Sequence, residues 1–337
     1  MTRNNKQKLK HILSLPIKVG AGFAISAVLA SSIATAQDYP QRPIKVVVAG
    51  PPAGGTDYLT RLLAEKLTAD LSKTVMVENR AGASGLIGTK YVKQEKADGY
   101  TLLMGHAATN AILPLIHQQK TYDPIKDFTP VSLVATAPEV LVVADESPIR
   151  SVADLIKMAQ KKPGEISYGT PGFGQPQHVL AERFSKQASI KLLHIPYNGS
   201  GPGLNDLVGG RLNSMFVTPG AVMPFIRDGR VRALAVSSQG RSKLLPDVPT
   251  LEEAGLVGLH QIGWFGVLGP ANLSGSTVKL LNKSIRKVMA EPKFREQVAA
   301  SYLEPVGSTS EAFVAFQYEE VAKFKDIVQA LQLKIEK

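Results

Sequence analysis

IKVVVAGPPAGGTDYLTRLLAEKLTADL, residues 44–71, is the stretch of sequence that decides the fold. Its first residues, Ile44–Ala49, are a β-branched apolar run that is typical of a strand buried on both faces. A turn rich in Pro and Gly follows at 50–55. Leucines then recur at helical spacing, which predicts an amphipathic helix from Asp57, with Thr56 or Asp57 as its N-cap. This order points main-chain N–H groups beyond the end of a strand, where they suit an anion.

The same design recurs later in the chain. Ile166–Thr170 reads as a strand, 171–175 as a Gly/Pro turn, and the next helix is predicted to start at Pro176, a residue favoured at the first helical position. Two such units facing one another would form an anion clamp with two sides. We therefore expect the two glycine turns to hold a carboxylate that the protein binds without reacting with it.

Strands alternate with helices along the whole chain, which predicts an α/β fold with largely parallel sheets and flanking helices. In such sheets, ligands bind beyond the carboxyl ends of the strands. The apolar stretch Val131–Ala144 is split at 135–139, as expected for a crossing between two domains. Trp264–Leu268 is predicted to be a strand that returns to the first domain. Ser308 and Glu311 have the spacing of a capping box that opens the last helix.

The N-terminus has the features of an export signal. Residues 1–18 carry five basic residues and no acid, and an apolar run of ordinary signal-peptide length follows at 19–33. Ala34-Thr35-Ala36 fits a cleavage site, so we expect 1–36 to be removed and the mature chain to start at Gln37. These features predict a periplasmic protein. Removal of the five basic residues lowers the formal net charge from +11 to +6.

Composition and motifs exclude several classes of function. The basic residues are scattered and not interleaved with aromatics, so we expect no nucleic-acid partner. The absence of cysteine excludes disulfides, thiolate metal sites and a cysteine nucleophile. The histidines lack ligand spacing, so we expect neither a metal nor a cofactor. Ser284 and Lys287 match a nucleophile pattern but stand without its companion motifs, and the sequence has no G-x-S-x-G, H-E-x-x-H or P-loop.

Ten short motifs occur in order along the mature chain. They are Tyr39-Pro40-x-Arg42-Pro43-Ile44, Pro52-Ala53-Gly54-Gly55-Thr56-Asp57, Val77-Glu78-Asn79-Arg80, Asp98-Gly99-Tyr100, His194-Ile195-Pro196-Tyr197, Gly199-Ser200-Gly201-Pro202, Leu207-Val208-Gly209-Gly210, Leu245-Pro246-Asp247-Val248-Pro249-Thr250, Glu253-Ala254-Gly255 and Trp264-Phe265-Gly266. Together these motifs resemble the Bug family, the TctC-like solute receptors of tripartite tricarboxylate transporters. The resemblance covers nearly the whole mature chain.

The resemblance implies a two-lobed periplasmic binding protein, a Venus flytrap, that closes on a carboxylate. It implies a first lobe of 38–137 plus 260–337 and a second lobe of 138–259. Ligands of the family are held largely by main-chain amides and bridging waters from two loops. Here these loops correspond to Pro52, Ala53, Gly54 and Gly55, and to Gly172, Phe173, Gly174 and Gln175. The implied partners are a small carboxylate and the membrane subunits of the transporter, and we expect the receptor to be a monomer.

Further candidate contacts follow from position. Ala107, Ala108 and Thr109 end a strand on the cleft side, and His178 lies in the first turn of a helix beside the second loop. Asn198 and Asp206 are placed near the cleft by the resemblance alone. Phe173 has two readings, as a cover for the body of the ligand or as a buried anchor of its loop. His178 likewise either helps to bind an anion or caps and packs its helix.

The ligand class stays open in part. Many family members carry an acid after the Met-Phe pair at 215–216, whereas this chain has Val217 and Thr218. This departure favours a carboxylate without an amino group. In the second loop, Gln175 and Gln177 stand where the family has small hydroxyl residues. Two other functions remain alternatives: a receptor that presents its ligand to a membrane sensor kinase and, more remotely, a hydrolase or isomerase.

Overall fold

The computed structural model describes residues 39–52, 54–117 and 121–334. The expected signal peptide, 1–36, and Ala53 of the first glycine turn lie outside the described residues. The chain from Pro40 onward forms one compact unit. Within the described ranges, no helix combines the length and the apolar character needed to cross a bilayer.

The first of two sheets has six strands in the order β11-β4-β10-β3-β1-β2. Its strands are β1 (Ile44–Val48), β2 (Val75–Asn79), β3 (Thr101–His106), β4 (Phe128–Pro138), β10 (Ile262–Pro270) and β11 (Glu304–Pro305). Strands β1, β2 and β3 run parallel, and β10, β4 and β11 add antiparallel pairings. The predicted strand at Trp264–Leu268 is confirmed as part of β10, which pairs with β3 and β4.

The second sheet has five strands in the order β7-β6-β8-β5-β9. Its strands are β5 (Val140–Ala144), β6 (Ser167–Thr170), β7 (Leu193–Pro196), β8 (Ser214–Val217) and β9 (Val231–Val236). Strand β6 is parallel to β7 and β8, whereas β5 is antiparallel to β8 and β9. Both sheets are therefore mixed, and the parallel strands form a triplet in each of them.

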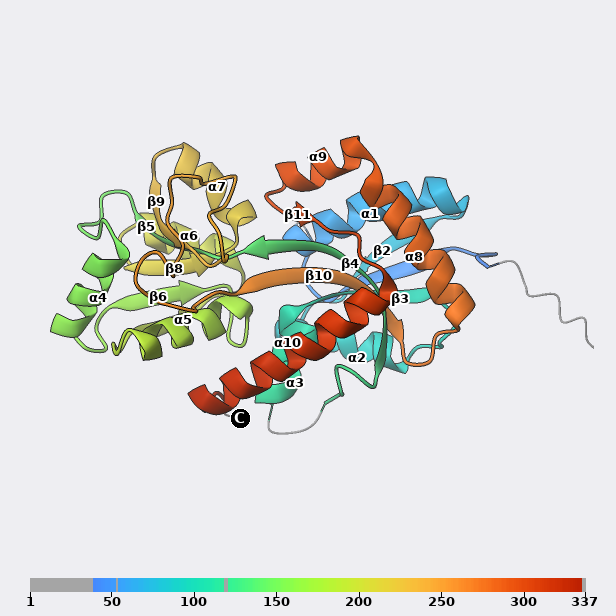
Figure 1. Cartoon of the computed structure of the whole chain (residues 1–337), viewed down its shortest axis with the longest axis horizontal. Helices are drawn as coiled ribbons and strands as arrows, with labels where there is room; N and C mark the ends of the chain where they lie inside the picture. Colours follow the sequence, from blue (N-terminus) through green and yellow to red (C-terminus); the bar gives the residue numbers. More distant parts are fainter. Residues whose placement is uncertain (1–38, 53, 118–120, 335–337) are drawn as a thin grey trace, which may run out of the picture. The chain divides into compact units, whose positions relative to one another are not determined.

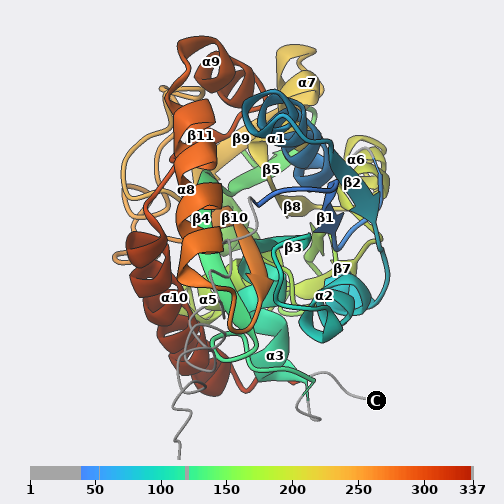
Figure 2. The same cartoon turned by 90° about the vertical axis from the view of Figure 1, so that its right-hand side faces the viewer.

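Helices cover both faces of each sheet. They are α1 (Gly55–Leu71), α2 (Leu86–Gln94), α3 (Leu113–Ile116), α4 (Val152–Lys161), α5 (Pro176–Gln187), α6 (Ser200–Val208), α7 (Pro219–Arg227), α8 (Gly275–Ala290), α9 (Pro292–Ala300) and α10 (Ser310–Leu331), with a 3-10 turn η1 (Ala83–Gly85) and a π turn η2 (Ala108–Ile112). Figure 2 shows α8 and α10 beside β4 and β11, with α1 and α2 nearer β1 to β3.

The unbroken apolar run of β5 explains why helices cover both faces of the second sheet. Leu141 and Val143 point into a core cluster with α4 and α5, and Val140 and Val142 point into another with α6 and α7. Successive side chains of a strand face opposite sides, so an unbroken apolar run is buried on both. This is the α/β, two-lobed arrangement that the sequence predicts (Figure 1).

The chain crosses between the sheets at two neighbouring segments. Strand β4 of the first sheet ends at Pro138, and β5 of the second begins at Val140, so Glu139 alone separates them. The return segment ends at Gln261, and Ile262 of β10 pairs with Pro138. The crossing predicted at 135–139 is thus confirmed in place, but it is narrower than predicted because β4 stays paired with β10 as far as Pro138.

Two predicted helix caps are wrong. The N-cap of α1 is Gly54, not Thr56 or Asp57, and it provides no side-chain bond. Asp57 instead lies buried in the first turn, where it accepts hydrogen bonds from Arg61 Nε (3.0 Å) and Asn79 Nδ2 (2.9 Å).

The last helix is also capped by a different residue. Thr309 caps α10 through a bond from the Ala312 N–H to its hydroxyl (3.1 Å). The predicted cap, Ser308, is occupied elsewhere because its hydroxyl accepts the N–H of Leu133 (2.9 Å).

Candidate functional site

The helices that follow the parallel strands share an unusual feature at their N-termini. Helices α1 and α2 follow β1 and β2 of the first sheet, and α5, α6 and α7 follow β6, β7 and β8 of the second sheet, in that order. None of these helices has a side-chain N-cap. The first-turn N–H groups of a helix lack partners within the helix, and the helix dipole makes its N-terminus attractive to anions.

Three helices that the structure describes do have a side-chain cap, namely α4, α8 and α10. The hydroxyls of Ser151, Ser274 and Thr309 accept first-turn N–H groups of α4, α8 and α10, which do not follow the parallel strands. Helix α9, which starts directly after α8, also has no side-chain cap. Uncapped N-termini therefore gather at the carboxyl ends of the two parallel triplets, where the two glycine turns also lie.

The second glycine turn packs against the first lobe. A Cβ atom on Gly174 would lie 2.6 Å from Ile116 Cδ1 and 2.9 Å from Leu113 Cδ2, both in α3. Gly174 also has a φ of +72°, so both its backbone and its surroundings require glycine. Next to it, Gly172 approaches Ser84, which would lie 4.0 Å from a Cβ on Gly172. The loops of the two lobes thus meet beside the parallel strands.

The loop before α2 was missed as a candidate part of the site. Gly82, Ala83, Ser84 and Gly85 have consecutive φ angles of +125°, +46°, +54° and +102°. Left-handed backbone at non-glycine residues such as Ala83 and Ser84 is strained, and such strain gathers at functional sites. A Cβ on Gly85 would lie 2.7 Å from Thr109 Cγ2, so this loop covers the end of β3. The signal available in the sequence is the pair of glycines, Gly82 and Gly85, that flanks this segment.

The residues predicted at the end of β3 lie beneath that loop. Ala107 and Ala108 are buried. Thr109 is also buried, and its hydroxyl donates to Asn110 Oδ1 (2.7 Å) and accepts from the His106 N–H (3.3 Å). The Thr109 hydroxyl is therefore engaged within the protein.

Aromatic rings form a stack behind the second turn. His178 lies between Phe173 (ring centroids 4.5 Å apart) and His194 (4.2 Å), and His194 stacks on Tyr168 (4.8 Å). The Gly174 N–H donates to His178 Nδ1 (3.3 Å). Phe173 is half-buried and packs against the core cluster that includes Leu113 and Ile116. Phe173 and His178 therefore support the turn through contacts within the protein.

Asn198 and Asp206 make no contact with either glycine turn among the hydrogen bonds of the described residues. Asn198 is exposed at the end of β7. Asp206, on α6, accepts hydrogen bonds from Arg211 Nη2 (2.6 Å) and from the Tyr197 hydroxyl (3.0 Å). The Arg211 and Tyr197 bonds lower the pKa of Asp206, so it carries its charge within an ion pair of its own lobe.

The first glycine turn is the most open part of the candidate site. Pro52 and Gly55 are exposed, and Gly54 is half-buried. A Cβ on Gly55 would meet no atom within 4 Å, so there is open space before the first turn of α1. An anion could approach these N–H groups without displacing a side chain.

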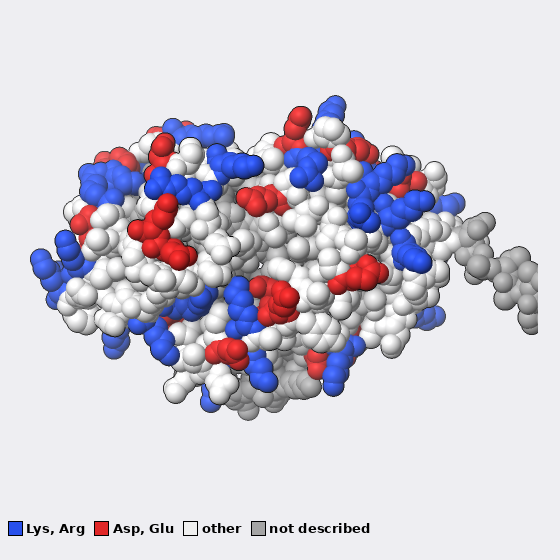
Figure 3. Space-filling model, in the orientation of Figure 1, with Lys and Arg blue, Asp and Glu red and all other residues white. Residues whose placement is uncertain are grey.

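Burial sets the charge state of the ring stack. Desolvation lowers the pKa of His178 to about 3, with a smaller contribution from His194, and lowers the pKa of His194 to about 4. Both imidazoles are therefore neutral at pH 7 and serve as uncharged packing surfaces. Among the described residues, no group of three His, Cys, Asp or Glu is arranged to hold a metal ion. On the face drawn in Figure 3, basic and acidic side chains are interspersed.

We expect the ring stack to make the fold sensitive to acid. Because both histidines have a lower pKa folded than the ordinary 6.5, their stabilising effect is complete above pH 6.5 and is lost as the pH falls through 4 toward 3. For each proton that the protein takes up on unfolding, the free energy of unfolding falls by about 1.4 kcal/mol for every unit by which the pH is lowered. His178→Phe should make this loss shallower in urea titrations between pH 7 and 4. His260→Asn, at an exposed position, should leave this pH dependence unchanged. Equal slopes of the free energy of unfolding against pH in the parent protein and both variants would contradict the expectation.

The fold and the site together define a class of protein. Two mixed sheets joined by adjacent crossings, with loops of both meeting at the carboxyl ends of parallel strands, make a two-lobed solute-binding protein of the Venus flytrap type. The chain belongs to the family described as the tripartite tricarboxylate transporter family receptor, TctC, whose model matches residues 59–333. This finding confirms the resemblance to the Bug family. The family is one of periplasmic solute-binding receptors.

Individual relatives agree with this assignment. The chain is 34% identical to protein BugT of Bordetella pertussis over 314 residues. The matched region covers 93% of this chain and 96% of BugT. It is similar to an R. palustris protein, Rpa4515, solved with adipate, with a TM-score of 0.83, 32% identity, and 88% and 99% of the two chains covered. It is also similar to MatC from Rhodopseudomonas palustris with bound malate, with a TM-score of 0.79, 26% identity, and 86% and 100% covered.

Proposed function

We propose that this protein captures a small carboxylate between its two lobes and delivers it to the membrane subunits of a tripartite tricarboxylate-type transporter. The observation that carries the proposal is the set of uncapped helix N-termini at the carboxyl ends of both parallel triplets. Two similar proteins were solved with adipate and with malate, both dicarboxylates. The proposed function involves neither catalysis nor a cofactor.

The ligand contacts are assigned to main-chain amides. We place the carboxylate between the first turn, Pro52 to Gly55, and the second, Gly172 to Gln175. Three or four charge-assisted hydrogen bonds of about 1.5–3 kcal/mol each reach the binding free energy of about −8 kcal/mol of a micromolar complex in the upper part of that range. No arginine is then required. Ala107, Ala108, Thr109, His178, Asn198 and Asp206 remain proposed borders of the site.

The division of the chain in this proposal follows the sheets except at Pro138, the last residue of β4. The first lobe comprises 38–137 and 260–337, and the second 138–259. Residues 1–36 direct export and are removed, so the mature receptor acts in the periplasm. An amino group on the ligand would need an acidic residue as its partner, and this chain has Val217 and Thr218 where many family members have one. We therefore infer a ligand without an amino group.

A screen of organic acids against residues 37–337 tests the proposal. We expect at least one acid among adipate, malate, citrate, benzoate and nicotinate to bind with micromolar affinity. At a hundredfold excess over its dissociation constant, such a ligand stabilises the native state by about 2.7 kcal/mol, which raises the melting temperature by about 5 °C or more. Calorimetry should confirm one site per chain.

The matched uncharged amide of the best acid is the control for the screen. Adipamide, for example, has the shape of adipate but lacks its negative charge, so it should produce little shift. Equal shifts with acid and amide would contradict binding by uncapped helix N-termini. An absence of any shift across acids of all these types would overturn the proposed function.

A further inference from the structure

A buried polar cluster, which we call the hinge cluster, joins the two segments that cross between the lobes to the first turn of α5: Glu139, Gln177, Ser237 and Gln261. Each member is at most 5% exposed. The Glu139 N–H donates to Ser237 Oγ (2.7 Å), and the Ser237 N–H donates back to the Glu139 carbonyl (2.9 Å). The Ser237 hydroxyl donates to the Gln261 carbonyl (2.5 Å). These bonds join the outgoing crossing to the returning one.

The hinge cluster is also bonded to the first turn of α5. Gln177 Nε2 donates to Glu139 Oε2 (2.8 Å), and Gln261 Nε2 donates to the Pro176 carbonyl (2.6 Å). Pro176 and Gln177 directly follow Gln175, the last residue of the second glycine turn. Two hydrogen bonds and one peptide link therefore connect the crossing to that turn.

Glu139 has no cation beside it. Glu139 is 1% exposed, and none of the ion pairs among the described residues involves it. The charged and titratable groups of its neighbours are engaged elsewhere. On α5, His178 lies in the ring stack, Glu182 accepts from the Tyr168 hydroxyl, and Arg183 donates to the His260 carbonyl.

The other segments around Glu139 bring no charge to it either. Strand β10 brings Gly263, where a Cβ would lie 3.2 Å from Glu139 Oε1, and the chain between β9 and β10 brings Ser237 and Gln261. His260, the titratable residue next to Gln261, is exposed to solvent. Burying an unpaired carboxylate is costly, so such a group keeps its proton.

The hydrogen bonds of the cluster favour the same protonation state. Among the described residues, Gln177 Oε1 and Gln261 Oε1 are buried without a hydrogen-bond partner. A carboxylate has acceptors only, whereas a neutral carboxylic acid adds an O–H donor. A proton on Glu139 thus adds a donor to a cluster that has acceptors in excess. Burial correspondingly raises the pKa of Glu139 to about 8, although the bond from Gln177 opposes this shift.

We propose that Glu139 is a protonated positioning residue at the hinge, and that its ionisation in mildly alkaline solution opens the lobes and loosens the second glycine turn. An ionised carboxylate is stabilised by water, and water reaches this position only if the packed crossings separate. Closure and proton binding at Glu139 are therefore linked, as any two equilibria that share a group must be. The inference rests on the proposed closure of two lobes but not on which solute is bound.

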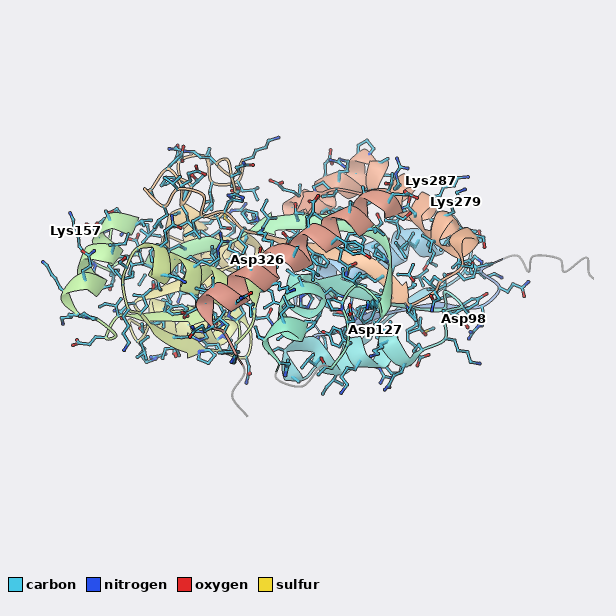
Figure 4. All side chains as sticks on the ribbon, turned by 60° about the horizontal axis from the view of Figure 1, so that its bottom comes forward. Asp98, Asp127, Lys157, Lys279, Lys287 and Asp326 are labelled. Carbon is cyan, nitrogen blue, oxygen red and sulfur yellow. The ribbon has the colours of Figure 1, made fainter. Side chains whose placement is uncertain are left out.

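The experiment follows the distance between the lobes without any ligand. The chain has no cysteine, so dyes can be attached at Lys157→Cys on α4 and Lys279→Cys on α8 alone. Both lysines are exposed, and Figure 4 shows them at opposite ends of the molecule. Energy transfer between the dyes should change in one step between pH 6 and 9.5. The same labels on Glu139→Gln should give a signal that stays flat across this range.

A second variant tests the link to the turn. Gln177→Leu removes the hydrogen bond that favours the ionised form, so it should move the midpoint of the step to higher pH. Circular dichroism at each pH separates opening from unfolding. A flat signal in the parent protein, or the same step in Glu139→Gln, would overturn the inference. An unchanged midpoint in Gln177→Leu would overturn the coupling to α5. Because no solute is added, these outcomes are independent of the carboxylate screen.

Discussion

Gly55→Val should abolish carboxylate binding while leaving the protein folded. Gly55 is the first residue of α1, and a Cβ there meets no atom within 4 Å, so the native fold has room for a larger side chain. The valine would instead occupy the space before the first-turn N–H groups, which have no side-chain cap. Main-chain amides can hold an anion only if it approaches them to hydrogen-bond distance. A branched side chain in that space removes several bonds together.

We expect the affinity for the best acid of the screen to fall at least about 100-fold, which corresponds to the loss of about 2.7 kcal/mol of binding free energy. Gly275→Val is the matched control. Gly275 is the first residue of α8, is exposed, and likewise has nothing within 4 Å of a Cβ, but its helix is capped by Ser274. Titration calorimetry and thermal melts of both variants make the comparison. Unchanged affinity in Gly55→Val would show that the anion is held elsewhere.

The parts of the fold that the sequence predicts well are those that local patterns determine. The β-branched run at Ile44–Ala49 becomes β1, and Pro176 begins α5 as predicted. Backbone preferences and apolar periodicity are properties of neighbouring residues, so they can be read without knowing the rest of the molecule. The position of the crossing at Glu139 followed in the same way from an interruption in an apolar stretch.

The wrong caps show where local reading fails. Asp57 looked like an N-cap because it precedes a leucine stripe, but Asn79, distant in sequence, bonds its carboxylate. Ser308 looked like a cap before α10, but its hydroxyl accepts the N–H of Leu133, 175 positions away. Polar side chains take the partner that the tertiary structure brings closest, and that partner is not visible in a short window of sequence.

The candidate site shows the same limit. Its glycine turns were found from composition, because glycine and proline mark turns directly. The strained residues Ala83 and Ser84 were missed, since neither residue type marks a left-handed backbone in a sequence, and the close approach of Gly85 to Ala49 and Thr109 is a tertiary contact. Uncapped helix N-termini were invisible for a similar reason. Whether a first turn has a side-chain partner depends on the rotamer and contacts of the residue before it.

Glu139→Gln should make the protein more stable in neutral and alkaline solution. The pKa of Glu139 is about 8 in the folded protein and ordinarily 4.5, so the unfolded chain releases its proton first as the pH rises. The stability that the protonated group provides is complete below pH 4.5 and is lost progressively as the pH rises through 8. Glutamine has nearly the same shape and no proton to lose, so the variant should lack this dependence.

At pH 8 we expect the variant to exceed the parent protein by about 4 kcal/mol in free energy of unfolding, since each unit of pKa difference corresponds to about 1.4 kcal/mol. At pH 4.5 the two should differ little. Urea titrations can follow the fluorescence of Trp264, the sole tryptophan, which is buried against Phe313 and Phe316. Glu165→Gln, at an exposed position, is the matched control and should change neither curve. A Glu139→Gln variant that is less stable than the parent protein at pH 8 would contradict this expectation. It would mean that Glu139 is ionised and paired in the folded protein, because removing a carboxylate charge lowers stability only when that charge has a stabilising partner.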